Sequence, residues 1–183
     1  MNDGCDDWEQ RARATWLRAS RELDGSITAL EFGDTVSGAA TGDASAAPRL
    51  LRLPLGVGAL ARRYLLAPRP GESAIEAAIA EAEEAIMPLR PLLPTGSRCV
   101  SADPHVAWIA EVLGLAPAPW LALDTQAVEH GFNRWVSIAL GRPATQDSLP
   151  ASAEFGASLL VLREWLHHLG FPRILSARPG AGP

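Results

Sequence analysis

The sequence lacks the features that would assign it to several broad classes of protein. It has no run of basic residues, and its 183 residues include 21 acidic against 16 basic side chains, which argues against a dedicated nucleic-acid-binding protein. Every apolar stretch is interrupted by Arg, Pro or Gly before the ~18 residues that a membrane span needs. The first residues are acidic and contain no apolar signal-peptide segment. We therefore expect a cytoplasmic protein that binds neither nucleic acid nor membrane.

The spacings typical of common catalytic and metal centres are also missing. The two cysteines, Cys5 and Cys99, are far apart and match no metal-binding pattern, which predicts free thiols in a reducing compartment. The four histidines show neither H-x-x-x-H nor H-E-x-x-H spacing, and no G-x-S-x-G elbow for a serine hydrolase occurs. No metal site is predicted, although one built from Asp103, His105 and a remote histidine stays open as an alternative.

What the sequence does contain is the composition of one folded domain. Hydrophobic residues make up 48% and charged residues 20%, a balance that predicts a packed core rather than disorder. Apolar residues at helical spacing predict helices over 6–21, 73–86, 103–113, 125–140 and 152–169. Short alternating or β-branched runs predict strands at 26–32, 49–55, 98–101, 120–123 and 173–176.

These predicted elements define a single α/β lobe over residues 1–176, with a small mixed sheet and helices packed on it. Residues 34–48 are almost all small or polar, which predicts a flexible loop through which the first two strands pair antiparallel. Residues 177–183 are predicted to form a frayed C-terminal tail.

A polar turn, Asp24-Gly25-Ser26, precedes the first predicted strand. The backbone N–H groups of a turn rich in Gly, Ser and Thr can close around a phosphate when they lie beside a strand. The same residues are equally compatible with an ordinary start of a strand. The turn is therefore a candidate phosphate loop whose function stays open.

A longer pattern follows at residues 53–65, which read L-P-L-G-V-G-A-L-A-R-R-Y-L. Together with the order of the neighbouring elements, this stretch resembles the exopolyphosphatase/guanosine pentaphosphate phosphatase family. In that family a loop D-x-G-G-G-S-T-E-L opens a lobe of the actin-like ATPase fold, and a run close to L-P-L-G-A-V-R-L-T-E-R-F follows. The resemblance implies a single actin-like (ribonuclease H-like) lobe, corresponding to the second lobe of the family.

The resemblance also implies positions for two phosphate loops. Aligned on Thr28 and Leu30, it places Glu22 at the family's Asp, as a catalytic candidate. The ligand-binding candidates that it implies are Asp24, Gly25, Ser26 and Thr28 in the first loop, and Ser101 and His105 in the second.

Departures from the family pattern concern both loops. Asp24 and Ser26 stand where the family has glycines, and Asp103-Pro104-His105 replaces Gly-Gly-Thr. A carboxylate repels the anion that such a loop would hold, and proline has no N–H to donate. The resemblance further implies that the family's first lobe, which carries a catalytic glutamate, has no counterpart in this chain.

We therefore expect a non-catalytic pseudoenzyme with degenerate phosphate loops. It would bind a protein partner, or form a homodimer, across the face left by the missing lobe. The alternative is a phosphoric anhydride hydrolase, or a polyphosphate- or nucleotide-binding protein, that uses Mg²⁺ and whose site a second chain completes.

Overall fold

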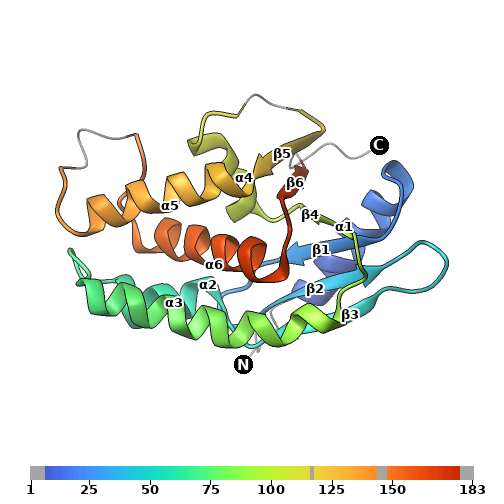
Figure 1. Cartoon of the computed structure of the whole chain (residues 1–183), viewed down its shortest axis with the longest axis horizontal. Helices are drawn as coiled ribbons and strands as arrows, with labels where there is room; N and C mark the ends of the chain where they lie inside the picture. Colours follow the sequence, from blue (N-terminus) through green and yellow to red (C-terminus); the bar gives the residue numbers. More distant parts are fainter. Residues whose placement is uncertain (1–6, 116–117, 144–147, 178–183) are drawn as a thin grey trace.

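A computed structural model describes residues 7–115, 118–143 and 148–177, and these form a six-stranded mixed sheet with helices on both faces (Figure 1). The strands lie in the order β3-β2-β1-β4-β6-β5. β1 pairs antiparallel with β2 and parallel with β4, while β6 pairs parallel with β4 and antiparallel with β5. The strands are β1 (Ile27–Glu31), β2 (Ser37–Gly42), β3 (Arg49–Leu53), β4 (Arg98–Ser101), β5 (Trp120–Asp124) and β6 (Arg173–Ala177). The expected α/β class, a mixed sheet with helices packed on it, is confirmed.

The helices form two unequal layers. They are α1 (Trp8–Glu22), α2 (Val57–Leu60), α3 (Glu72–Ile86), α4 (Pro104–Val112), α5 (Thr125–Ala139) and α6 (Ala153–Leu169), with a π-helical turn η1 (Ala61–Leu65) and a 3₁₀ turn η2 (Met87–Leu92). α1 covers one face of the sheet alone and packs Trp8 and Trp16 against Ile27 and Val100. The larger core lies on the other face, where α6 runs between α3 and α5 (Figure 1).

Side-chain caps define where several helices start. The carboxylates of Asp103 and Asp124 and the hydroxyl of Ser152 each accept a hydrogen bond from a backbone N–H in the first turn of α4, α5 and α6. These caps satisfy N–H groups that have no partner within the helix. For α4 and α5 the capping residue lies within two residues of the end of the preceding strand, so the cap ties the helix N-terminus to that strand.

The flexible loop expected at residues 34–48 is wrong for Ser37–Gly42, which forms β2 and lies between β1 and β3. The reason is the close packing of α1. A Cβ atom on Gly38 would lie 2.3 Å from the indole ring of Trp8, so this position of the strand must be glycine, a residue that is uncommon in strands. β1 and β3 therefore each pair with β2 rather than with each other.

Ala177 ends β6, so the predicted tail at 177–183 does not include it, and 178–183 lie outside the described residues. Cys5 also lies outside them, whereas Cys99 is a free and buried thiol. Within the described part of the chain, no helix combines the length and apolar character needed to span a bilayer.

Candidate functional site

A pocket of about 420 Å³ lies where β1 and β4 end. Its walls come from the β1–β2 turn, the start of α2, the start of α4, one side chain of α1 and one of α6. The lining residues are Arg11, Phe32, Gly33, Asp34, Val57, Gly58, Asp103, Pro104, His105 and Glu154. Because β1 and β4 are parallel, the turns that follow them meet at this edge of the sheet.

The carboxylate of Asp103 connects these two turns and is 2% exposed. Its Oδ2 accepts a hydrogen bond of 2.9 Å from the backbone N–H of Phe32, and its Oδ1 accepts one of 2.8 Å from the N–H of His105. In a phosphate loop, N–H groups of this kind point at a bound anion. Here a side chain of the protein itself occupies them.

Glu31 is a second buried carboxyl group beside Asp103, with 1% exposure. The hydroxyl of Thr15 donates to it at 2.8 Å, and Nε of Arg11 lies 3.5 Å from its other oxygen. Burial, with a further contribution from the charge of Asp103, raises the pKa of Glu31 to about 7. The site therefore holds a carboxyl group that changes charge near neutral pH.

The imidazole of His105 lies between two carboxylates. Nδ1 is 3.0 Å from Oδ1 of Asp103, and Nε2 is 3.2 Å from Oε1 of Glu154. The hydrogen bond with Asp103 is the main cause that raises the pKa of His105, and burial opposes it. His105 is thus positioned as an internal counter-ion rather than as a group directed at a ligand.

Asp34 lies in the β1–β2 turn and is held by the segment that carries the family resemblance. Both nitrogens of the Arg62 guanidinium donate to its carboxylate, at 2.8 and 2.7 Å. A Cβ atom on Gly56 would lie 2.2 Å from the backbone carbonyl oxygen of Asp34, so the turn and the start of α2 fit only because residue 56 has no side chain. Residues 53–65 therefore form the support of the turn.

The structure brings together only part of the residue set expected from the sequence. His105 lines the pocket, and Ser101 lies directly beneath it, where its hydroxyl donates to the carbonyl of Leu30 at 2.7 Å and accepts from the N–H of Asp103. Both residues are engaged in contacts within the protein.

The residues of the expected first loop lie elsewhere. Asp24, Gly25 and Ser26 precede β1 and are therefore at the opposite end of this strand from the pocket. Thr28 is buried within β1, where its hydroxyl lies 2.8 Å from that of Thr41. Glu22 ends α1 and accepts a 2.6 Å hydrogen bond from the indole N–H of Trp120.

The sequence alignment placed the first loop before β1, whereas the turn at the pocket follows this strand. Sequence reasoning therefore missed Glu31, Asp34 and Glu154 as residues of the site. A signal for the turn was present, because Glu31-Phe32-Gly33 fits the family's D-x-G at the end of a strand. In this register, Asp34 and Thr35 stand at the next two glycines of the family pattern.

A possible metal-ligand group occurs on the other side of the core. Among the residues that the structure describes, Glu83, Glu164 and His168 place ligand atoms within 4.8 Å of one another. Nε2 of His168 lies 3.1 Å from both carboxylates, and Arg163 pairs with Glu164. These contacts partly balance the charges of the two carboxylates without a metal ion. The alternative site of Asp103, His105 and a remote histidine is not assembled within the described part of the chain.

Comparison with known proteins gives the fold of the chain. No family model and no curated protein matches the sequence. Among solved structures, the Aquifex aeolicus Ppx/GppA phosphatase (type II variant) matches with a TM-score of 0.74 and 14% identity, over 92% of this chain and 59% of that one. An exopolyphosphatase from Cytophaga hutchinsonii matches with a TM-score of 0.70 and 12% identity, over 93% of this chain and 60% of that one.

The chain thus has a partial, single-lobe Ppx/GppA-like fold and spans about 60% of the length of the solved structures that it matches. Identity this low shows the fold alone. The resemblance seen in the sequence is confirmed at that level.

The raised pKa of Glu31 predicts a specific dependence of stability on pH. Because its folded-state pKa of about 7 is above the ordinary 4.5, protonated Glu31 favours folding, and this contribution is lost as pH rises from about 4.5 to 7. Replacing Glu31 by Gln should raise the free energy of unfolding by about 2 kcal/mol at pH 8 and change it little at pH 5. Urea denaturation at both pH values measures this. Glu76→Gln, on the exposed face of α3, is the control, and a Glu31→Gln effect that is equal at both pH values would contradict the assignment.

Proposed function

We propose that this chain, a Ppx/GppA-like lobe, is non-catalytic and acts by binding a protein, either a partner or a second copy of itself, at the pocket where β1 and β4 end. The observation that carries this proposal is the position of the Asp103 carboxylate, which accepts hydrogen bonds from the backbone N–H groups of Phe32 and His105. The donors that would hold a phosphate at these turns already have an anion as their partner.

The charge around the pocket supports the same conclusion. The acidic groups are Glu31, Asp34, Asp103 and Glu154. The two nearest guanidinium groups, of Arg11 and Arg62, form ion pairs with Glu31 and Asp34. The four carboxyl groups outnumber the two guanidinium groups, and neither guanidinium is left without a carboxylate partner, so Coulomb repulsion disfavours the binding of a phosphate group. Mg²⁺ fits this donor set poorly, because both oxygens of Asp103 accept hydrogen bonds and Asp34 is paired with Arg62.

A protein surface suits the outer part of this pocket. Asp34 and Arg62 are more than half exposed, and so is Glu154. Charged side chains of this kind are typical of the rim of a protein interface, where they add specificity. In the two-lobe family that the sequence resembles, this face would lie against the other lobe, and we take a partner surface to fill that place.

One observation favours the alternative of an active hydrolase whose site is completed by a second chain. Glu31 has a pKa of about 7 in a buried position, and a carboxyl group with such a value is suited to general acid–base catalysis. Its contacts with Thr15 and Arg11 fit a structural role equally well, and an activity assay separates the two functions.

Phosphate release distinguishes the two proposals. The purified chain is incubated with polyphosphate and with guanosine pentaphosphate in the presence of Mg²⁺, and we expect no release above the rate without protein. Turnover that is lost in Glu31→Gln and retained in Glu76→Gln would overturn the non-catalytic proposal.

One form of the proposal, in which the partner is a second copy of the chain, predicts self-association through the pocket. Sedimentation velocity between 1 and 100 μM should show a dimer that Glu154→Arg weakens at least tenfold, about 1.4 kcal/mol, because the change reverses a charge at the rim. Glu76→Arg on α3 is the control. A monomer at every concentration would contradict self-association and leave a different protein as the proposed partner.

A further inference from the structure

The side chains of Glu83, Glu164 and His168 converge on one point between α3 and α6. Glu164 and His168 are four residues apart on α6, so they lie on the same face of this helix. Nε2 of His168 is 3.1 Å from Oε1 of Glu83 on α3 and 3.1 Å from Oε2 of Glu164. None of the three residues lines the pocket where β1 and β4 end, and the proposed function does not use them.

One imidazole N–H cannot satisfy both carboxylates. Nε2 of His168 carries at most one hydrogen, yet two acceptor oxygens lie at the same distance from it. The hydrogen bond is either shared between the two oxygens or made to one of them alone. A cation at this point has no such limit, because the nitrogen and both oxygens can ligate it together.

Negative charge exceeds positive charge in the network around this point. The guanidinium group of Arg163 pairs with Glu164 and, through hydrogen bonds of 2.7 and 3.2 Å, with Glu129. Together with Glu83, the network holds three carboxylates and one guanidinium. Glu164 is 1% exposed, so its charge must be compensated by partners rather than by water. A divalent cation beside a neutral imidazole brings the network to charge neutrality.

Arg163 also determines which oxygen of Glu164 faces the other two side chains. Nη1 of Arg163 donates to Oε1 of Glu164, and this leaves Oε2 directed at His168. Contacts of this kind, from a neighbouring residue to a ligand, orient the ligands of metal sites in proteins. The buried carboxylate is therefore held with one oxygen available for a metal ion.

The spacing of the three groups suits Zn²⁺. Bonds of about 2.1 Å from one zinc ion to nitrogen and oxygen separate neighbouring ligand atoms by about 3.0–3.4 Å. The two distances of 3.1 Å lie in this range, and all three ligand atoms lie within 4.8 Å of one another. Glu83 is 42% exposed, so its side chain can adjust to the ion, and water can reach a fourth position. An imidazole nitrogen among the ligands favours zinc over Mg²⁺, which prefers oxygen.

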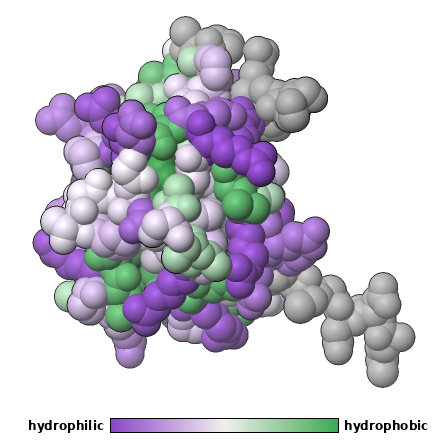
Figure 2. Space-filling view, turned by 90° about the vertical axis from the view of Figure 1, so that its right-hand side faces the viewer, coloured by the Kyte–Doolittle hydropathy of each residue, from purple (hydrophilic) through white to green (hydrophobic). Residues whose placement is uncertain are grey.

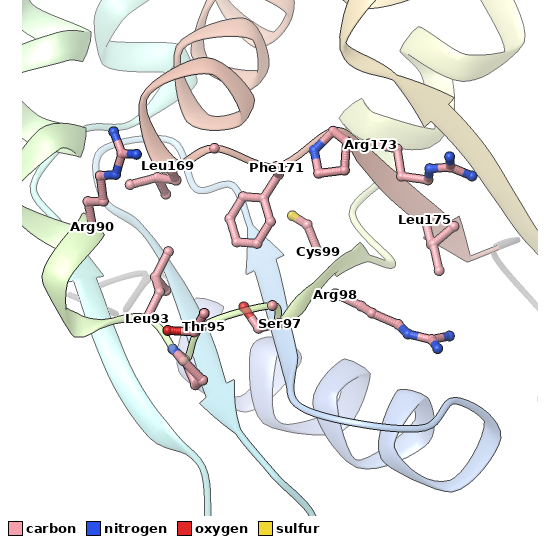
Figure 3. Close-up of a pocket in the computed structure, with 14 residues that line it drawn as sticks. Arg90, Leu93, Thr95, Ser97, Arg98, Cys99, Leu169, Phe171, Arg173 and Leu175 are labelled. Atoms are coloured by element: carbon pink, nitrogen blue, oxygen red, sulfur yellow. The ribbon is translucent and has the colours of Figure 1, made fainter.

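The larger openings in the described part of the chain show no comparable convergence of groups. The hollow of about 740 Å³ between residues 93–98 and 169–173 is lined by Phe171, but Figure 3 shows the guanidinium groups of Arg98 and Arg173 directed away from that ring. At the end of the molecule on the right of Figure 1, apolar areas are separated by hydrophilic side chains (Figure 2). That end therefore presents no continuous apolar docking surface.

We propose that Glu83, Glu164 and His168 bind one Zn²⁺ ion, which joins α3 to α6 at the side of the larger core. The sequence carries a signal for this site, because Glu164 and His168 have the i, i+4 spacing of two metal ligands on one helix. The folded chain holds the three ligands together, whereas the unfolded chain has no preformed site. Zinc binding therefore stabilises the fold.

Isothermal titration of the full, metal-free chain, without an affinity tag, with ZnCl₂ tests the proposal. We expect one ion per chain, a dissociation constant of about 10 μM or below, and at least tenfold weaker binding of Mg²⁺. Glu83→Gln and His168→Gln should each weaken zinc binding at least tenfold, because each replaces a ligand atom by a neutral amide. Zn²⁺ should also raise the midpoint of thermal unfolding of the unaltered chain more than that of either variant.

The matched control is His167→Gln, which removes the adjacent and exposed imidazole and should bind Zn²⁺ as the unaltered chain does. The rings of His167 and His168 are 4.9 Å apart, so this pair separates a ligand from its immediate neighbour. No binding of Zn²⁺ at 100 μM would overturn the proposal. So would unchanged binding by Glu83→Gln and His168→Gln, an equal loss in His167→Gln, or equal affinity for Mg²⁺.

Discussion

The buried carboxylate of Asp103 is the interaction on which the arrangement of the candidate site depends. It starts α4 by accepting the N–H of His105, and it joins α4 to the end of β1 by accepting the N–H of Phe32. A carboxylate that accepts backbone N–H groups in a buried position is strongly held, because charged hydrogen bonds are stronger than neutral ones. It also has a consequence for function, since the same N–H groups are no longer available to an external anion.

The remaining contacts of the site also join groups of the protein to one another. Ser101 joins β4 to β1 beneath the pocket, and Arg62 holds Asp34 in the turn above it. Glu31 is buried beside Asp103, which is unfavourable for two ionised carboxylates and raises the pKa of Glu31. The site is thus a network of paired charges within the protein, on a fold that in the matching solved structures belongs to phosphatases.

Much of the fold could be predicted from the sequence, because long helices with a clear apolar stripe, such as α3 and α6, depend mainly on local pattern. β2 could not, since glycine at position 38 is required by the distant ring of Trp8 rather than by strand propensity. The order of the elements also predicted the actin-like lobe. Solved structures of that fold match the chain at only 12–15% sequence identity and confirm the prediction. No family model matches the sequence.

The candidate site was predicted less well, because a strand has a turn at each end and the wrong turn was selected. A phosphate loop is recognised by its glycines, and with these replaced, the alignment on Thr28 and Leu30 selected the turn before β1 instead of the one after it. The sequence identified Asp103 as an unfavourable charge, but not that its partners are N–H groups of both turns. The proximity of Glu31 to Asp103 depends on the parallel pairing of β1 with β4, which no local pattern reveals.

The account predicts that Asp103 blocks anion binding, and titration calorimetry with pyrophosphate tests this most directly. Asp103→Ser keeps a helix cap while it removes the negative charge, so it should free the N–H of Phe32. The unaltered chain and the control Asp24→Ser should bind more weakly than about 1 mM, and Asp103→Ser at least tenfold more tightly than either. Micromolar binding by the unaltered chain that is lost in Asp103→Ser would contradict the account.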